Sequence, residues 1–161
     1  MKRLAFAIGG LVGAAAVATT LLVATASGRS SAGTTFHLIE KDQAFHYIDN
    51  PPISSGHIAS LGDTFTFKSA LLSKAMKPSG TLVVSCTVTS GGRTSTDTCF
   101  GTFMLKSGEL IAVASVRGQP KVTHIAIVGG TGAYVGARGE ITSVSRGENS
   151  PFTDDTVRLL P

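Results

Sequence analysis

The sequence predicts an all-β domain, and two observations carry that prediction. From Gly33 onward, apolar residues mostly recur at every second position, which is the period of a strand and not of a helix. Turn-forming residues recur about every ten residues, a spacing typical of β-sandwiches and β-barrels. The chain has 161 residues, so the part after its first segment fits one domain.

The first segment has the layout of an export signal. Lys2 and Arg3 precede an uncharged run rich in Ala, Val and Leu, which ends in the small residues Ala24-Thr25-Ala26. We therefore expect residues 1–26 to be a signal peptide, residues 27–33 a flexible leader and residues 34–161 the domain, secreted from the cell. The uncharged run could also cross a bilayer of about 30 Å, so a membrane anchor with the domain outside is the alternative.

Strand periodicity then predicts eight strands in order along the chain. They are residues 34–41, 63–73, 81–90, 96–105, 109–116, 122–128, 137–146 and 152–160. Residues 43–61, which contain Pro51-Pro52, are expected to form a long loop with room for one short strand.

Two turns predict the register of three neighbouring strands. The turn at residues 91–94 sets up these facing pairs: Cys86 and Cys99, Val84 and Gly101, Leu82 and Phe103. A turn at Ser107-Gly108 adds two more pairs: Leu105 and Leu110, Phe103 and Ala112. The register puts these residues on one face: Leu82, Val84, Cys86, Val88, Phe103, Leu105, Leu110, Ala112, Ala114 and Val116.

The opposite face of these strands is also partly apolar, with Phe100, Met104, Ile111 and Val113. A monomeric antiparallel sheet usually has one wet face. Two apolar faces therefore indicate either a filled lumen on one side with a subunit interface on the other, or covering loops, and we favour the homo-oligomer.

The two cysteines, Cys86 and Cys99, are predicted to form a disulfide, because an exported chain meets oxidising conditions and the register brings them face to face. Its role is expected to be structural. A redox role would require a short C-x-x-C spacing or an activating histidine nearby, and the sequence has neither.

Several other functions find no support in the composition. The formal charge of +4 includes Lys2 and Arg3, basic residues are scattered, and there is no Trp, so nucleic acid is not an expected partner. The four histidines lack metal-ligand spacing, so no metal site is expected. No cofactor is expected either, since the P-loop, G-x-S-x-G and H-E-x-x-H patterns do not occur.

The most specific motif is GGTGAYVGARG within residues 125–141. Gly129, Gly130 and Gly132 permit backbone conformations that other residues avoid, Tyr134 is expected to anchor the turn, and Arg138 to re-enter the sheet. A nucleotide-binding loop fits poorly, because a valine occupies the third glycine position of G-x-G-x-x-G and a strand comes after it.

This motif resembles the strand, glycine turn and strand of the allene oxide cyclase/dirigent-like barrel superfamily. EKDQAF from Glu40, SLGDTFTFKSALL from Ser60 and the paired cysteines resemble bacterial secreted members. The resemblance implies an eight-stranded antiparallel β-barrel with an apolar lumen, which in plant members is often assembled as a trimer.

The catalytic pattern of the plant allene oxide cyclases matches poorly. In those enzymes a first-strand glutamate, an asparagine and a tyrosine act on an epoxide. The resemblance puts His37 and Ile39 in the first two positions, and residues 115–120 contain no tyrosine. Plant-type cyclisation is therefore not expected, because a neutral imidazole cannot stabilise developing positive charge.

His37 is a candidate for acid–base work if it points inward, although a strand histidine satisfied by water or backbone is the plainer interpretation. The candidate residues of a ligand-binding lumen are His37, Ile39, Val84, Phe103 and Ala112.

The sequence supports two functional hypotheses. The first is a barrel that binds a hydrophobic small molecule and steers its cyclisation or coupling, with an isomerase-like activity left open. The second is a non-catalytic structural or cell-surface protein whose barrel is filled by side chains such as Phe65, Phe67 and Phe103. An open pocket of about 300 Å³ or more lined by polar residues would favour the first hypothesis, and a packed interior the second.

Overall fold

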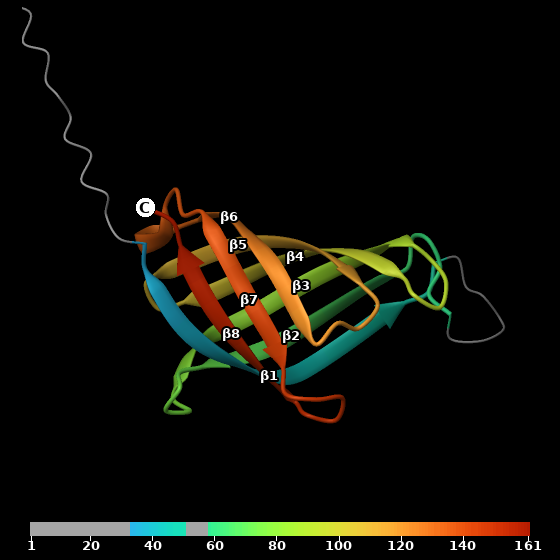
Figure 1. Cartoon of the computed structure of the whole chain (residues 1–161), viewed down its shortest axis with the longest axis horizontal. Helices are drawn as coiled ribbons and strands as arrows, with labels where there is room; N and C mark the ends of the chain where they lie inside the picture. Colours follow the sequence, from blue (N-terminus) through green and yellow to red (C-terminus); the bar gives the residue numbers. More distant parts are fainter. Residues whose placement is uncertain (1–32, 51–57) are drawn as a thin grey trace, which may run out of the picture.

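The computed structural model, which describes residues 33–50 and 58–161, is a closed barrel of antiparallel strands (Figure 1). Each strand pairs with the next one in the sequence, and pairing of β1 with β8 closes the barrel. The strands are β1 (Thr35–Ile48), β2 (Thr64–Leu72), β3 (Pro78–Ser90), β4 (Thr96–Leu105), β5 (Gly108–Arg117), β6 (Val122–Gly130), β7 (Gly139–Ser145) and β8 (Phe152–Leu159).

The described residues contain one short helical piece, the 3-10 turn η1 (Gly132–Tyr134) between β6 and β7, and no helix among them is long and apolar enough to cross a membrane. The fold is thus all-β, as predicted. The expected signal peptide, residues 1–26, and all but the last residue of the expected leader lie outside the described residues.

The predicted pairing of β3 with β4 is confirmed. Cys86 faces Cys99, and the neighbouring facing pairs are also those expected. The predicted pairing of β4 with β5 is wrong by two residues: Leu105 faces Gly108, and Phe103 faces Leu110. The turn consists of the two residues between Leu105 and Gly108, and because the error is an even number, every side chain keeps its predicted face.

Strand β1 continues seven residues beyond its predicted end, so the prediction of a loop that begins at residue 43 is wrong. Its pairing with β2 shifts between Asp42 and Ala44, which leaves Gln43 as an extra residue. Such a β-bulge reverses the alternation of side chains beyond it, so the end of the strand does not show a continuous period of two. The other seven predicted strands match the structure to within three residues at each end.

The barrel is closed along only part of its length. Pairing of β1 with β8 ends at Lys41 and Phe152, whereas pairing of β1 with β2 continues to Ile48 and Thr64. On the other side, β5 pairs with β6 only as far as Val113, while β4 and β5 stay paired to Arg117. Figure 1 shows β1 to β4 reaching beyond the ends of β7 and β8. The lumen therefore opens into a trough formed by the longer strands.

The closed half holds the packed core, which is made by inward side chains from all eight strands. Its fully buried members include Leu71, Phe103, Leu110, Ile141 and Val157. The side chain of Phe100, on the predicted outer face, is 61% exposed, and that of Met104 is 37% exposed. The predicted assignment of these side chains to an inner and an outer face is thus confirmed.

Candidate functional site

A cavity of about 1580 Å³ occupies the barrel where the closed half meets the trough. Its floor and walls come from inward positions of the strands. Its mouth lies among the connections β1–β2, β3–β4 and β5–β6, which contribute Ala59, Arg93 and Gln119. The volume exceeds the roughly 300 Å³ at which ligand sites begin. A barrel filled by its own side chains, the second hypothesis, would not leave this space.

Aromatic and aliphatic side chains form most of the wall. Phe45, Phe65 and Phe67 line the trough, and the rings of Phe45 and Phe65 lie 5.8 Å apart between centroids. Of the five predicted lumen residues, three line the cavity: Val84, Phe103 and Ala112. A planar apolar molecule can pack against this wall with little water left between them.

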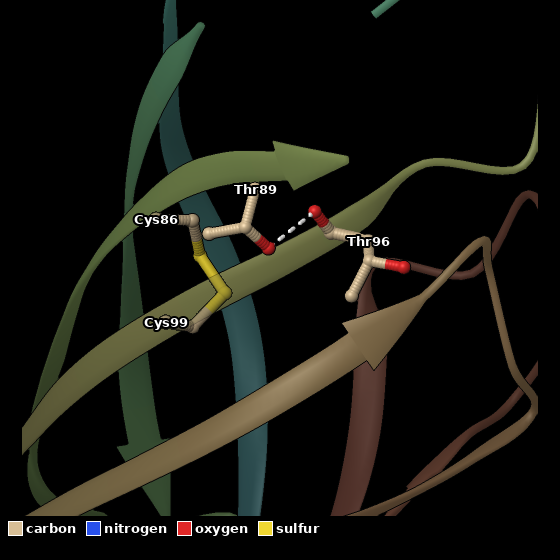
Figure 2. Close-up of a disulfide and its surroundings, with 4 residues drawn as sticks. All are labelled: Cys86, Thr89, Thr96 and Cys99. Atoms are coloured by element: carbon tan, nitrogen blue, oxygen red, sulfur yellow. Dashed lines mark hydrogen bonds between the residues drawn. A yellow bond between two sulfur atoms is a disulfide. The ribbon is translucent and has the colours of Figure 1, made fainter. Parts of the chain in front are cut away.

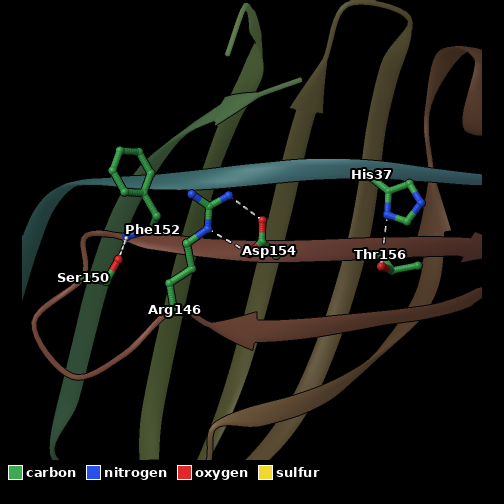
Figure 3. A network of polar contacts seen from close by, with 6 residues as sticks. All are labelled: His37, Arg146, Ser150, Phe152, Asp154 and Thr156. Atoms are coloured by element: carbon green, nitrogen blue, oxygen red, sulfur yellow. Dashed lines mark hydrogen bonds and ion pairs between the residues drawn. The ribbon is translucent and has the colours of Figure 1, made fainter. Parts of the chain in front are cut away.

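The predictions that His37 and Ile39 line the lumen are wrong. His37 is exposed on the outer face, where its Nδ1 lies 3.1 Å from Oγ1 of Thr156 on β8 (Figure 3). Ile39 is buried, but it does not line the cavity. Because side chains alternate along a strand, the inward positions are those of Phe36, Leu38 and Glu40.

Figure 3 also shows a second polar network on the outer face, farther along β8 from Thr156. Arg146 pairs with both carboxylate oxygens of Asp154, with Nη2 2.7 Å from Oδ1, and stacks 5.5 Å from the ring centre of Phe152. This network fastens the β7–β8 connection to the outside of the barrel. It does not contribute a group to the lumen.

Glu40 is the functional candidate that sequence reasoning missed. It lines the cavity from β1 and is only 7% exposed, so a first-strand carboxyl group does face the lumen. The part of the argument against plant-type cyclisation that placed a histidine there loses its basis, whereas residues 115–120 still contain no tyrosine. Alternation counted from Phe36 and Leu38 would have put Glu40 and Asp42 on the inner face.

Glu40 lies beside Asp155 of β8, which is 1% exposed. Burial and the neighbouring Asp155 raise the pKa of Glu40 well above its ordinary 4.5, and burial also raises the pKa of Asp155. No hydrogen bond of ordinary geometry reaches either oxygen of Asp155, although Glu40 and Ser143 lie close enough to lower the pKa of Asp155. A protonated Glu40 would donate one, and the raised pKa values of both groups favour their protonated forms.

Two further acids lie toward the mouth. Asp97 lines the cavity from β4, is 8% exposed, and its Oδ1 has no hydrogen-bond partner. Asp63 is fully satisfied: the Tyr47 hydroxyl donates to it, as do the backbone N–H of Asn50 at 2.9 Å and that of Ser60 at 2.7 Å. These donors lower the pKa of Asp63, and its carboxylate raises the pKa of Tyr47 to about 12.

The predicted disulfide is present, and both of its cysteines line the cavity (Figure 2). Farther along β3, Oγ1 of Thr89 donates a 3.0 Å hydrogen bond to the carbonyl oxygen of Thr96, which ties the ends of β3 and β4 together. The disulfide joins β3 and β4, which already pair with each other. It strengthens this pair in the trough, where β6 to β8 no longer close the barrel.

The glycine motif closes the other end of the barrel. A Cβ on Gly130 would lie 2.5 Å from the carbonyl oxygens of Glu109 and Tyr134, and Gly132 has a φ of +58°, so both positions require glycine. Gly129 has open space and no such constraint. Tyr134 packs its ring 6.5 Å from that of Phe36, and the carbonyl oxygen of Arg138 accepts a hydrogen bond from the backbone of Leu160.

No family model and no curated protein matches the chain. Solved structures do match it in fold. A pyocyanin demethylase matches 78% of this chain and 99% of its own, with 24% identity and a TM-score of 0.66. A pterocarpan synthase dirigent protein matches 82% and 97%, with 14% identity and a TM-score of 0.66. An exo-specific intermolecular Diels-Alderase matches 78% and 96%, with 11% identity and a TM-score of 0.59.

Proposed function

Since the chain has the allene oxide cyclase/dirigent-like barrel fold, we propose that it binds an apolar small molecule in its lumen and promotes isomerisation or ring closure of that molecule by proton transfer from Glu40. One observation carries the proposal. The cavity of about 1580 Å³ combines an apolar wall with the buried carboxyl group of Glu40, whose pKa burial raises well above its ordinary value.

The wall and the acid have separate tasks. The phenylalanines of the trough hold the ligand in one conformer, which lowers the entropy that ring closure would otherwise have to overcome. Glu40 then donates its proton to an oxygen of the ligand. The carboxylate so formed lies beside Asp155, where it is a stronger base than an isolated glutamate. It takes a proton back from ligand carbon, so the proton balance is that of an isomerisation.

The matched proteins support this proposal at the level of the fold. One is a pterocarpan synthase dirigent protein and another is an intermolecular Diels-Alderase, so the same fold occurs in proteins named for bond-forming reactions. The role of Glu40 is argued from this chain alone.

Binding can be tested with a neutral fluorescent probe, N-phenyl-1-naphthylamine. We expect saturable binding, and we expect Ala114→Leu to weaken it because Ala114 lines the cavity. Ser115→Leu is the matched control, because Ser115 is the next residue on β5 and is exposed. Absence of saturable binding, or equal loss in both variants, would contradict the proposal.

The protonated acid can be tested with protein labelled with ¹³C in the glutamate carboxyl groups. One resonance should titrate well above the ordinary glutamate pKa and disappear in Glu40→Gln. If the resonance lost in Glu40→Gln instead titrates like an exposed glutamate, the acid–base role is wrong.

We further propose that the protein acts outside the cytoplasm, as a secreted or membrane-anchored domain. The Cys86–Cys99 disulfide supports this, because such bonds persist in oxidising compartments. We also propose a homo-oligomer, a trimer by resemblance. It is supported by an outward patch on β3 to β5 that includes Val83, Phe100 and Met104.

A further inference from the structure

The environment of Asp97 lacks what a buried carboxylate ordinarily needs. Its neighbours across the sheet are Val88 on β3 and Val116 on β5, and both line the cavity. Asp97 is 8% exposed, and its Oδ1 is buried without a hydrogen-bond partner. A side-chain hydrogen bond from Ser95 lowers the pKa of Asp97, but burial outweighs it and leaves that pKa raised. A carboxylate placed between two valines is costly to bury unless something else supplies a donor or a positive charge.

No side chain of the described residues supplies that charge. The basic residues that line the cavity are Arg93 and Arg117, and both are exposed at the mouth. Two ion pairs between described residues, that of His124 with Glu140 and that of Arg146 with Asp154, lie on the outside of the barrel. The missing partner of Asp97 is therefore to be sought in what the cavity binds.

The surroundings favour a cation over a neutral donor. The wall that carries Asp97 also carries aromatic rings. Cys99 lies two residues from Asp97 on β4 and faces Cys86 on β3. Cys86 in turn faces Phe65 on β2, and the ring of Phe65 packs against that of Phe45. Aromatic faces attract organic cations, and they do so more strongly where water is excluded. A carboxylate and phenylalanine rings on one wall form a site for a positively charged group attached to an apolar body.

We propose that the ligand is an organic cation, a protonated amine or iminium group on an aromatic body, with Asp97 as its counter-ion. The inference rests on the proposed function and names the ligand class of the same cavity. The cationic end lies at Asp97 near the mouth, and the rest of the molecule extends toward Glu40 and Asp155 at the floor. Asp97 thus binds the charged end of the ligand, and the pair of Glu40 and Asp155 carries out the proton transfer.

The arginines at the mouth do not oppose this assignment. Both are exposed, so water and salt screen their charges over about 8 Å at physiological ionic strength. Asp97 is buried, and its interaction with a cation in the cavity is screened much less.

Three fluorescent tricycles of matched outline test the proposal: 9-aminoacridine, which is a cation at neutral pH, the neutral 9-anthracenemethanol, and the anion 9-anthracenecarboxylate. We expect the cation to bind at least about tenfold more tightly than either of the others. Equal affinities would overturn the cation assignment and leave the proposed function standing. If none of the three binds, both are wrong.

Substitution of Asp97 separates the counter-ion from general electrostatics. Asp97→Asn and Asp97→Leu should remove the preference for the cation while both still bind the neutral probe, which also reports that they are folded. Glu140→Gln, which removes an acid from the outer face, should keep the preference. Retention of the full preference in both Asp97 variants would overturn the proposal.

The pH dependence gives a readout that a structural role would not produce. Burial raises the pKa of Asp97, so affinity for the cation should fall as pH is lowered through that pKa. The groups around it are Ser95, Val88, Val116, Arg93 and Arg117, with Tyr47 across the trough. Asp97→Asn should lose this part of the pH dependence, and an unchanged profile in that variant would contradict the assignment.

Discussion

The carboxyl groups of Glu40 and Asp155 lie beside each other inside the barrel, on the two strands whose pairing closes it. Both pKa values are raised, mainly because burial penalises the charged forms. The folded protein therefore holds protons that the unfolded chain gives up. Linkage then requires that the free energy of unfolding fall as pH rises through the range between the unfolded and folded pKa values.

We predict that this fall is present in the native protein and smaller in Glu40→Gln. Each pH unit by which the folded pKa exceeds the unfolded one corresponds to about 1.4 kcal/mol at pH values above both. Urea unfolding between pH 4.5 and pH 8 measures it. At neutral pH the variant should be the more stable protein, and identical pH profiles would contradict the raised pKa of Glu40.

A second prediction concerns the hydrogen bond between Tyr47 and Asp63. The carboxylate of Asp63 raises the pKa of Tyr47 to about 12. In Asp63→Asn the phenol loses this partner, so its pKa should move back toward the ordinary 10. The sequence has two tyrosines, so ultraviolet titration in a Tyr134→Phe background isolates Tyr47. A phenol that titrates alike with and without Asp63 would show that the bond is absent in solution.

Loss of the disulfide should destabilise the barrel. Cys86 and Cys99 are 13 residues apart, and closing a loop of that size in the unfolded chain stabilises a fold by about 3 kcal/mol in the chain-entropy model. We expect the double variant Cys86→Ser/Cys99→Ser to lose about that free energy of unfolding. The native protein should weigh about 2 Da less than its reduced form, and stoichiometric thiol labelling without reductant would refute the bond.

The pairing of these cysteines shows which part of the fold the sequence can predict. A turn that begins with two glycines, Gly91 and Gly92, fixes register locally, so the sequence alone places Cys86 and Cys99 face to face. The next hairpin has a tighter turn than expected, and its register was wrong by two residues. Local turn chemistry thus predicts the pairing only where the turn type itself is known.

The candidate site was harder to predict, because β1 carries two irregularities. Leu38 and Ile39 are adjacent apolar residues, so either face could have been the inner one, and the resemblance favoured the face of His37. The bulge at Gln43 then reverses the alternation before Phe45. The acidic pair could not be inferred at all, since Glu40 and Asp155 lie at opposite ends of the domain sequence and meet only when the barrel closes.

The outward patch gives a prediction about assembly. Phe100 lies at the centre of this patch and is 61% exposed. It faces Ser85 on β3 and Val113 on β5. We expect light scattering after size exclusion to report an oligomer, and Phe100→Ser to shift it toward the monomer without loss of the β-sheet circular dichroism signal. Thr66→Ser, at an exposed position of β2, is the control that should leave the mass unchanged. A native monomer would contradict the proposal.

The last prediction distinguishes two adjacent glycines of the turn motif. Gly130 lies under η1, and a Cβ there would come within 2.5 Å of the carbonyl oxygens of Glu109 and Tyr134 and within 2.7 Å of the Tyr134 Cβ. Two of these three atoms belong to the backbone, so the turn itself would have to move. Gly130→Ala should therefore lower the free energy of unfolding by roughly 2 kcal/mol, as overpacking does.

Gly129→Ala is the matched control one residue earlier on β6. No atom lies within 4 Å of a Cβ at Gly129, so the added methyl group meets open space. Alanine also restricts the unfolded chain more than glycine does, which should leave stability unchanged or raise it by about 0.5 kcal/mol. Urea unfolding of both variants at one pH gives the comparison. Equal effects at the two positions would show that close approach of the backbone does not determine which glycine the turn requires.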